Sequence, residues 1–311
     1  MVVDGRPISP DAFVMWAERL RPAIEREQAS FFEATTAIAL ADFAARGAEV
    51  AVIEVGLGGR LDATNVVRTV VSAVTRVRRE HTEYLGEDVL GIAREKAGIA
   101  KPGIPMLLGE DDPATLEALR IAAAALGAPV VTVPAAETWE GPLALVGAHQ
   151  RRNAAVAFRI LQELPADLRP GPEAVARAFG TTTVPGRFDR RGRYLFDVAH
   201  NPDGVAALVA TLAGSPPPRP LHAVVGILAD KDWRAMLEAL RPAVDALWVT
   251  DPPSAPRERR LDLGQVDGLV EPDFGRALLC AGAGAGTVLV TGSFHTVGDA
   301  MARLPGFAPL G

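Results

Sequence analysis

The sequence predicts an α/β protein of two domains, each built around a largely parallel sheet. Short, β-branched, uncharged runs alternate with alanine-rich, amphipathic stretches along most of the chain. This alternation is typical of parallel strands joined by helices. It is interrupted by a Pro/Gly-rich patch at residues 165–172 and restarts after TTTVPGR. A length of 311 residues also suits two domains. We therefore predict domains at residues 1–184 and 185–311, which meet near Pro185.

The first domain opens with a clear helix signal. Ser9 is a favourable N-cap, and Pro10 suits the first helical turn. Further along, short apolar runs indicate strands, and longer periodic stretches indicate helices. Helices are expected from residue 10 and at 31–46, 87–100, 113–126, 149–161 and 173–179, with strands at 50–53, 69–75, 105–108 and 130–133.

The second domain repeats the alternation with shorter connections. Asn201 and Pro202 mark a helix start directly after an apolar run, as an N-cap and a first-turn proline do. Strands are expected at 194–198, 222–228, 247–250 and 287–290, and helices at 202–212, 233–240, 274–281 and 296–303.

Composition narrows the class of protein. The chain is 49% hydrophobic with a net charge of −6 and no basic run, so nucleic acid is not an expected partner. No apolar run reaches the roughly 20 residues of a membrane-spanning helix. The first residues, MVVDGRPISP, show no secretory signal, and the one cysteine, Cys280, forms no disulfide within the chain. We expect a cytoplasmic monomer, with Cys280 as a packing residue.

The stretch EVAVIEVGLGGRLDATN, residues 49–65, is the most informative part of the sequence. Residues 50–53 form a β-branched run that suits a buried strand, and Glu54 follows near its carboxyl end. Gly56 and Gly58 then open a loop in which the backbone can approach a ligand closely. Because ligands bind beyond the carboxyl ends of parallel strands, this pattern suits a cation or phosphate–metal site. The residue types alone equally allow a strand-end carboxylate followed by a simple turn.

Two further residues gain meaning from their position. His81 follows the expected strand at 69–75, which would place it at the same carboxyl edge of the sheet. Lys96 lies on the next expected helix. Taken singly, a lone histidine is more often structural and a helical lysine more often a solvated charge.

Five segments, in this order, resemble the folylpolyglutamate synthase/dihydrofolate synthase family of Mur-ligase-like, ATP-dependent amide ligases. They are EVGLGGRLDATN, HTEYLG with REKAGI, GAHQRRN, PGRF and DVAHNP. The resemblance implies a central ATP-binding domain followed by a C-terminal, Rossmann-like ligase domain that binds glutamate. It also implies a ligase that uses ATP and Mg²⁺ to join L-glutamate to a dihydropteroate or tetrahydrofolate polyglutamate carboxylate through an acyl phosphate.

The resemblance assigns roles to residues of the first three segments. Glu54 and His81 match residues that hold magnesium in the family. Lys96 matches a lysine that is carbamylated and supports the metal and phosphate site. Asn153 matches an asparagine near the adenine. Phe32, in the short segment FFE, resembles a residue of the segment near the pterin.

The last two segments supply the expected nucleotide and reaction residues of the second domain. Arg187 of PGRF matches an arginine that reaches ATP, and Asp197 of DVAHNP an aspartate that contacts the nucleotide. His200 matches the histidine near the γ-phosphate and the incoming amino acid. His200 would lie on a strand-to-helix turn, where backbone N–H groups favour anions. Asn201 as a plain N-cap is compatible with this role.

Two features depart from the family pattern. Before His81 the chain reads TRVRRE, where the family usually has an apolar stretch ending in aspartate, so Arg76, Arg78 and Arg79 bring positive charge near the expected metal. The sequence also contains no G-x-x-x-x-G-K-[ST] phosphate loop, which in the family lies upstream of the segment resembling VVDGRPIS. The resemblance thus implies a member that lacks its N-terminal part, and the chain as written is expected to ligate glutamate poorly.

Two other functions stay open at the level of sequence. A chain without the phosphate loop could be a non-catalytic remnant of the ligase. A cell-wall amino-acid ligase of the same superfamily is the second alternative, and EVGLGGRLDATN speaks against it.

Overall fold

The computed structural model describes residues 1–79 and 82–304, which form two compact units. The first unit comprises Met1–Glu137 and Val156–Arg169, and the second comprises Thr138–Ala155 and the residues from Pro170 onward. Helix α6 (Ala148–Glu163) gives its first half to the second unit and its second half to the first. The predicted α/β class with largely parallel sheets is confirmed.

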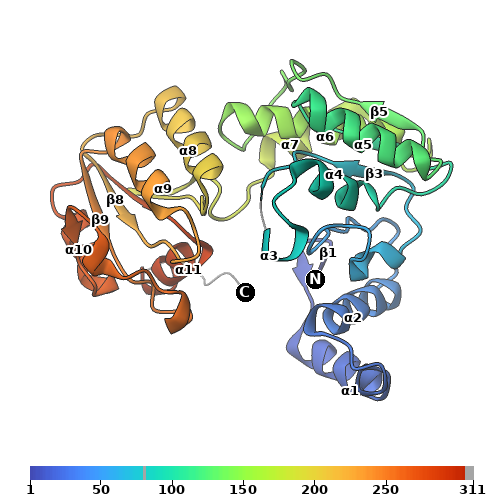
Figure 1. Ribbon diagram of the computed structural model, residues 1–311, viewed down its shortest axis with the longest axis horizontal. Coiled ribbons are helices and arrows are strands. Elements are labelled where there is room, and N and C mark those ends of the chain that lie inside the picture. The colour runs from blue at the N-terminus through green and yellow to red at the C-terminus, as the bar shows by residue number, and fades with distance from the viewer. Residues whose placement is uncertain (80–81, 305–311) are drawn as a thin grey trace. The chain divides into compact units, whose positions relative to one another are not determined.

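The first unit contains a three-stranded parallel sheet in the order β3-β4-β5 (Figure 1). The strands are β3 (Ser72–Val74), β4 (Met106–Leu108) and β5 (Val130–Thr132). Helices α4 (Val89–Ala97) and α5 (Pro113–Ala125) bury apolar side chains against one face of this sheet. The second half of α6 packs on the other face, where Val156 contacts the cluster of Leu107 and Val133. The helix α3 (Thr82–Leu85) precedes α4.

The first 45 residues add a helical hairpin to this unit. The strands β1 (Val2–Val3) and β2 (Arg6–Pro7) pair antiparallel, and α1 (Pro10–Arg26) and α2 (Phe31–Ala45) follow. The predicted cap is confirmed, since Ser9 Oγ accepts a hydrogen bond from Ala12 N at 3.2 Å. Helix α1 buries no side chain, so its apolar residues contribute little to the core.

The prediction of a buried strand at residues 50–53 is wrong. These residues adopt no regular structure, and 51% of Val50 and 95% of Val52 are exposed to solvent. A strand requires a hydrogen-bonded neighbour. Within the described part of the chain, the first unit's parallel sheet consists of β3, β4 and β5 alone. The β-branched run therefore has the composition of a strand without a ladder partner, and Glu54 lies on an open loop.

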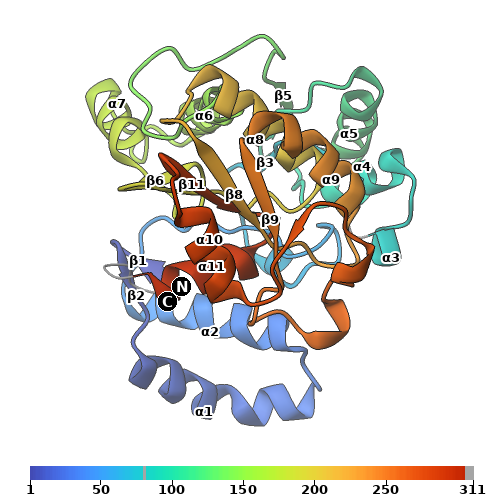
Figure 2. The same ribbon diagram turned by 90° about the vertical axis from the view of Figure 1, so that its left-hand side faces the viewer.

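The second unit contains a six-stranded sheet in the order β10-β9-β8-β11-β7-β6. All neighbouring strands are parallel except β6, which runs antiparallel to β7. Helices α8 and α9 pack on one face and α10 and α11 on the other (Figure 2). The elements are β6 (Asp189–Arg191), β7 (Tyr194–Phe196), α8 (Pro202–Gly214), β8 (Leu221–Val225), α9 (Trp233–Leu240), β9 (Ala246–Val249), β10 (Leu269–Val270), α10 (Phe274–Gly282), β11 (Thr287–Thr291) and α11 (Phe294–Arg303).

This topology places a switch point at the carboxyl edge of the second sheet. Strand β11 lies between β8 and β7, and the chain leaves β8 towards α9 but leaves β11 towards α11 on the opposite face. Open α/β sheets bind ligands at such switch points. Gly292, which follows β11, has a φ of +106° and no room for a Cβ, because that atom would lie 2.7 Å from the carbonyl oxygen of Gly226. The two loops therefore lie in close contact.

The compact units divide differently from the predicted domains. Residues 138–155 and 170–184, expected in the first domain, pack with the second unit, and the latter stretch includes the whole of α7 (Pro172–Thr181). The ring of Trp139 packs edge-on against Phe179 with 5.0 Å between centroids, and Ala144 N donates to Phe179 O at 2.9 Å. These contacts hold the segment after Glu137 to α7. A functional boundary at Pro185 stays a prediction.

None of the helices among residues 1–79 and 82–304 combines the length and the apolar character that a membrane span needs.

Candidate functional site

The glycine-rich loop of the first unit docks on the last turn of α4. A Cβ at Gly59 would lie 2.8 Å from the carbonyl oxygen of Glu95, so only glycine allows this approach. Arg60 N donates to the same carbonyl at 2.9 Å, and the Arg60 guanidinium donates twice to Glu95 Oε1, at 3.0 and 2.9 Å. The loop is thereby fixed to the helix turn that carries Lys96, whose side chain is half-buried.

Asp62 organises the interior of this loop. Its Oδ2 accepts hydrogen bonds from Gly56 N at 3.1 Å and Leu57 N at 2.9 Å, and its Oδ1 accepts from Thr64 N at 2.9 Å and Thr64 Oγ1 at 2.5 Å. Partial burial raises the pKa of Asp62, but the hydrogen bonds from Thr64, Leu57 and Gly56 outweigh it and leave the pKa below its ordinary value. Asp62 is therefore an ionised internal acceptor at neutral pH.

Lys101, which the sequence analysis did not single out, completes the loop. Its Nζ donates to both the backbone carbonyl and the side-chain Oδ1 of Asn65, each at 2.7 Å. The amide nitrogen of Asn65 donates in turn to the carbonyls of Arg60 at 3.0 Å and Gly98 at 3.1 Å. The lysine thus holds the end of the DATN segment against the end of α4. Its only sequence signal is the conjunction of a lysine with the GIAKPG turn.

Glu54 and Phe32 lie along one groove of about 330 Å³ between α2 and the loop. Glu54 is exposed, and the ring of Phe32 packs so closely on Gly56 that a Cβ there would lie 2.5 Å from Phe32 Cζ. The structure therefore brings two predicted candidates of the first unit, Glu54 and Phe32, to the same surface. His81 lies outside the described residues.

Two of the three arginines that depart from the family pattern, Arg76 and Arg78, are paired with acids. Arg76 forms a salt bridge with Asp111, and Arg78 lies 3.5 Å from Glu110 and 3.6 Å from Asp111. Glu110 is only 1% exposed, and its carboxylate accepts hydrogen bonds from Val77 N at 2.6 Å, Asp111 N at 2.8 Å and Asp112 N at 2.9 Å. The acids that follow β4 therefore balance the positive charge that follows β3.

The exposed carboxylate of Glu54 is the candidate metal ligand among the described residues of the first unit. Among residues 1–79 and 82–304, no three or more His, Cys, Asp or Glu side chains are grouped to hold a metal. Mg²⁺ commonly takes only one or two protein carboxylates and completes its shell with phosphate oxygens and water. The exposed carboxylate of Glu54 fits that requirement, since the other nearby acid, Asp62, is already occupied by loop donors.

In the second unit, Asp197 joins the two motif loops. Its Oδ2 accepts from Phe188 N at 2.9 Å, and its Oδ1 accepts from Ala199 N at 3.0 Å. Phe188 has a φ of +48°, a conformation that such a tether helps to maintain. Burial raises the pKa of Asp197, although these two hydrogen bonds and the charge of Arg187 oppose the rise. Both oxygens of Asp197 are therefore engaged with the backbone.

The aromatic ring of Phe294, at the start of α11, contacts both Arg187 and His200. Arg187 Cζ lies 5.9 Å from the ring centroid, within cation–π range. The imidazole of His200 lies 5.4 Å from it, centroid to centroid, at an interplanar angle of 44°. Gly186 lets the PGRF turn approach α11, because its Cβ would lie 3.3 Å from Val297 Cγ1. Sequence reasoning missed Phe294, which follows the TGS segment after β11.

The tautomer of His200 follows from its hydrogen bond. Its Nδ1 lies 3.0 Å from the carbonyl oxygen of Val198. A carbonyl oxygen only accepts, so Nδ1 carries the proton, and Nε2 is the nitrogen left for a ligand. Asn201 caps α8 as predicted, through its Oδ1 and Gly204 N at 2.7 Å.

Asn153 is exposed on the first half of α6, where its amide nitrogen donates to Gln150 Oε1 at 3.3 Å. This half of the helix packs with the second unit, whereas the sequence predicted it in the first domain.

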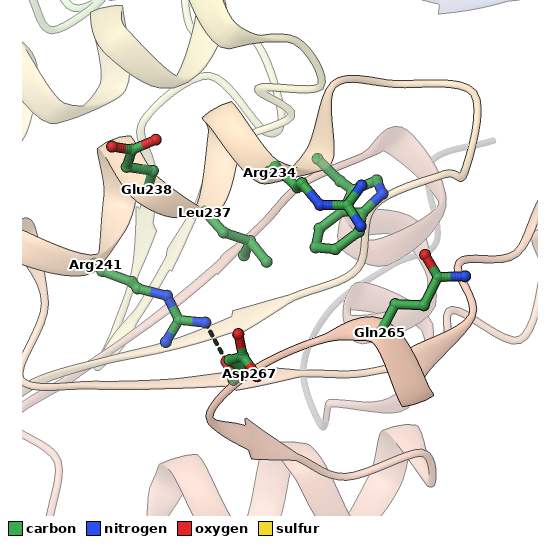
Figure 3. Close-up of a pocket in the computed structure, with 7 residues that line it drawn as sticks. Arg234, Leu237, Glu238, Arg241, Gln265 and Asp267 are labelled. Atoms are coloured by element: carbon green, nitrogen blue, oxygen red, sulfur yellow. Dashed lines mark hydrogen bonds between the residues drawn. The ribbon is translucent and has the colours of Figure 1, made fainter.

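A separate hollow of about 290 Å³ lies between α9 and the segment before β10 (Figure 3). Arg234 stacks over the Trp233 ring there at 4.1 Å, and Arg241 donates to the carbonyl oxygen of Asp267. None of the residues singled out by the motifs lines this hollow.

Comparison with known proteins identifies the family. Residues 186–294 match the model of the Mur ligase, glutamate ligase domain. The chain is 34% identical to the dihydrofolate synthase/folylpolyglutamate synthase of Escherichia coli, over 88% of this chain and 69% of that protein. The chain belongs to the folylpolyglutamate synthase/dihydrofolate synthase family. The Mycobacterium tuberculosis member is 33% identical over 80% of this chain, and the chain covers 61% of its length, so it spans under two thirds of that relative.

Solved structures of family members agree with this assignment. Escherichia coli FolC in complex with ADP superposes with a TM-score of 0.85 at 32% identity, covering 97% of this chain and 78% of FolC. The Mycobacterium tuberculosis folylpolyglutamate synthase complexed with ADP gives a TM-score of 0.84 at 30% identity, covering 99% of this chain and 81% of that one.

Proposed function

We propose that this family member takes part in the ATP-dependent addition of L-glutamate to the carboxylate of dihydropteroate or a folylpolyglutamate. The observation that carries the proposal is the meeting of Arg187, Asp197 and His200 at the switch point of the second sheet. Relatives named as folylpolyglutamate and dihydrofolate synthases favour folate over a cell-wall substrate. The partners would be small molecules, ATP with Mg²⁺, the folate or dihydropteroate and glutamate, and the protein would act as a monomer.

The reaction has two steps that balance without a further reagent. An oxygen of the folate carboxylate attacks the γ-phosphorus of ATP, and ADP leaves, which gives an acyl phosphate. The amine nitrogen of glutamate then attacks the acyl carbon, inorganic phosphate leaves, and the amine loses a proton. Both steps develop negative charge on phosphoryl oxygens, so fixed cations and N–H donors are the groups that accelerate them.

The second unit offers two such groups, Arg187 and His200, and a carboxylate that positions their loops. Arg187 is exposed and would bind phosphate oxygens. Nε2 of His200 is the nitrogen left free by the bond to Val198, and would accept the proton of the amine or donate to phosphate when protonated. Asp197 would act through its tethers to Phe188 and Ala199, which hold both loops in place. Asn153 is proposed to contact the adenine.

The first unit would supply the residues that bind the metal ion and the folate. Glu54, with His81, would hold Mg²⁺, which when bound neutralises charge on the nucleotide phosphates. Lys96, if carbamylated, would add an anion at the end of α4, where the glycine loop docks. Phe32 would contact the pterin along the groove that it shares with Glu54.

The test is phosphate release that requires ATP, L-glutamate and either dihydropteroate or a tetrahydrofolate. His200→Ala is expected to lower turnover by about 100-fold, a typical general acid–base contribution, while changing the affinity for ATP less. His222→Gln is the matched control, because His222 lies at the amino end of β8. Unchanged turnover of His200→Ala at saturating ATP and glutamate, or release that depends on a cell-wall precursor instead of folate, would refute the proposal.

A further inference from the structure

We infer that Phe294 is a positioning residue that fixes the Arg187 guanidinium and the His200 imidazole relative to each other. The inference rests on the proposed function, because it concerns how the two groups act in one reaction. Its basis is that one exposed ring contacts both a guanidinium and an imidazole.

The backbone around Phe294 is rigid enough for this role. Ser293 caps α11 by accepting from Thr296 N at 3.1 Å, and Thr296 Oγ1 donates to the carbonyl of Gly226 at 2.7 Å. Ser293 and Thr296 are both buried, at 3% and 0% exposure. The first turn of α11 is therefore bonded to the loop after β8, and the Phe294 side chain projects from a fixed point.

The exposure of the ring argues against a packing role. Phe294 is 57% exposed, so it contributes little to the core beneath it, where Val297 and Met301 of α11 are fully buried. Arg187 is also exposed, and a long, solvated arginine samples many rotamers unless a contact restricts it.

The ring provides that restriction without using the groups that react. A cation–π contact holds the guanidinium through its face and leaves its N–H donors for phosphate oxygens. The tilted ring contact holds the imidazole plane, while Val198 holds Nδ1, so Nε2 stays accessible. A leucine at this position would keep apolar volume and lose both aromatic contacts, whereas a tyrosine would keep them.

The experiment compares Phe294→Leu, Phe294→Tyr and the control Leu279→Ala in the whole protein. Leu279 is 76% exposed on α10 of the same unit and contacts neither motif loop among the described interactions. Phe294→Leu is expected to lower turnover in the glutamate-dependent assay about tenfold, while KM for ATP changes less than about twofold. Phe294→Tyr and Leu279→Ala are expected to keep near wild-type turnover.

Two further readouts separate positioning from general structure. In the background of Arg187→Ala or His200→Ala, Phe294→Leu should cost much less than it does alone, because residues that act together are non-additive. In NMR spectra of the unliganded protein, the His200 ring protons should lose a ring-current displacement in Phe294→Leu and keep it in Phe294→Tyr.

Each outcome decides the inference. Unchanged His200 shifts in Phe294→Leu, full additivity in the double variants, or an equal loss in Leu279→Ala would overturn it. A wild-type protein without folate-dependent phosphate release would refute the proposed function alone, because the NMR comparison tests the position of His200 without turnover.

Discussion

Removing the Asp62 carboxylate should release the glycine-rich loop of the first unit from its docked conformation. Asp62→Ala deletes the acceptor of three backbone N–H groups and one hydroxyl, those of Gly56, Leu57 and Thr64. The Thr64 pair alone resembles an N-cap, whose loss costs about 1 kcal/mol. The donors of Gly56 and Leu57 can be partly rehydrated, so we assign them about 0.5 kcal/mol each. Asp62→Ala should therefore lower the free energy of local opening of the loop by about 2 kcal/mol.

Hydrogen exchange measured by mass spectrometry tests this change in the free energy of opening within the loop itself. A loss of about 2 kcal/mol corresponds to exchange about 30-fold faster in peptides that cover residues 54–66. The matched control is Asp88→Ala, which removes an exposed N-cap from α4 that accepts from Leu90 N and Gly91 N. It should accelerate exchange at the start of α4 and leave residues 54–66 unchanged.

The same prediction has a pH dependence with a definite sign. The pKa of Asp62 is lowered in the folded protein, so its contribution to stability is present above the ordinary value of 3.8 and is lost as pH falls through the folded pKa. The difference in urea midpoint between wild type and Asp62→Ala should therefore shrink below about pH 4. Equal exchange of residues 54–66 in wild type and Asp62→Ala would refute the assignment of Asp62 as organiser of the loop.

Three further predictions concern charge and close packing. Glu110→Gln should lower the free energy of unfolding by about 3 kcal/mol in urea titrations, because a buried acceptor beside Arg78 loses its charge. Glu117→Gln, which removes an exposed ion pair with Arg120, should leave the free energy of unfolding nearly unchanged. Burial raises the pKa of Asp197, so the folded protein is destabilised as pH rises above 3.8 and this buried carboxyl ionises. Asparagine cannot ionise, so the melting temperature of Asp197→Asn should rise relative to that of wild type between pH 4 and pH 7 in thermal scans. Gly59→Ala should destabilise the first unit by about 2 kcal/mol in urea titrations, since its Cβ would meet the Glu95 carbonyl. The control Gly103→Ala has open space at its Cβ and only a φ of +72° to oppose it, so it should cost about 1 kcal/mol.

The sequence predicted the second unit more accurately than the first. The strands expected at 194–198, 222–228, 247–250 and 287–290 correspond to β7, β8, β9 and β11. Each of these runs is apolar and has a parallel neighbour to bond with. The antiparallel strand β6 was missed, because its sequence DRR has no apolar signal. Its pairing with β7 is the only property that makes it a strand.

The failure at residues 50–53 has the complementary cause. The run has the composition of a buried strand, yet Val52 is almost fully exposed. Composition indicates that these side chains would gain free energy from burial, but it does not indicate whether a partner strand is present. The prediction that placed Glu54 at a strand end failed with it. Asp62 was overlooked, since a carboxylate that accepts hydrogen bonds from its own loop cannot be distinguished from a surface acid by sequence pattern.

Within the second unit, motif spacing located the candidate residues but not what holds them. Arg187 and His200 were predicted from PGRF and DVAHNP, and both lie where the chain turns at the sheet edge. Phe294 comes from the last strand–helix connection and joins them only because β11 is inserted between β8 and β7. Such a contact depends on strand order, which no local pattern reveals.

The arginines before His81 illustrate how charge is balanced across a parallel sheet. Read along the chain, TRVRRE places three positive charges beside an expected metal site and suggests repulsion. In the fold, β3 and β4 are neighbours in register, Ser72 with Met106 and Val74 with Leu108, so the residues that follow both strands emerge side by side. The acids of GEDD then meet the arginines, and Glu110 also accepts the backbone donors that the turn would otherwise bury unsatisfied. Arg76 and Arg78 are therefore engaged by acids at the adjacent strand end of their own unit.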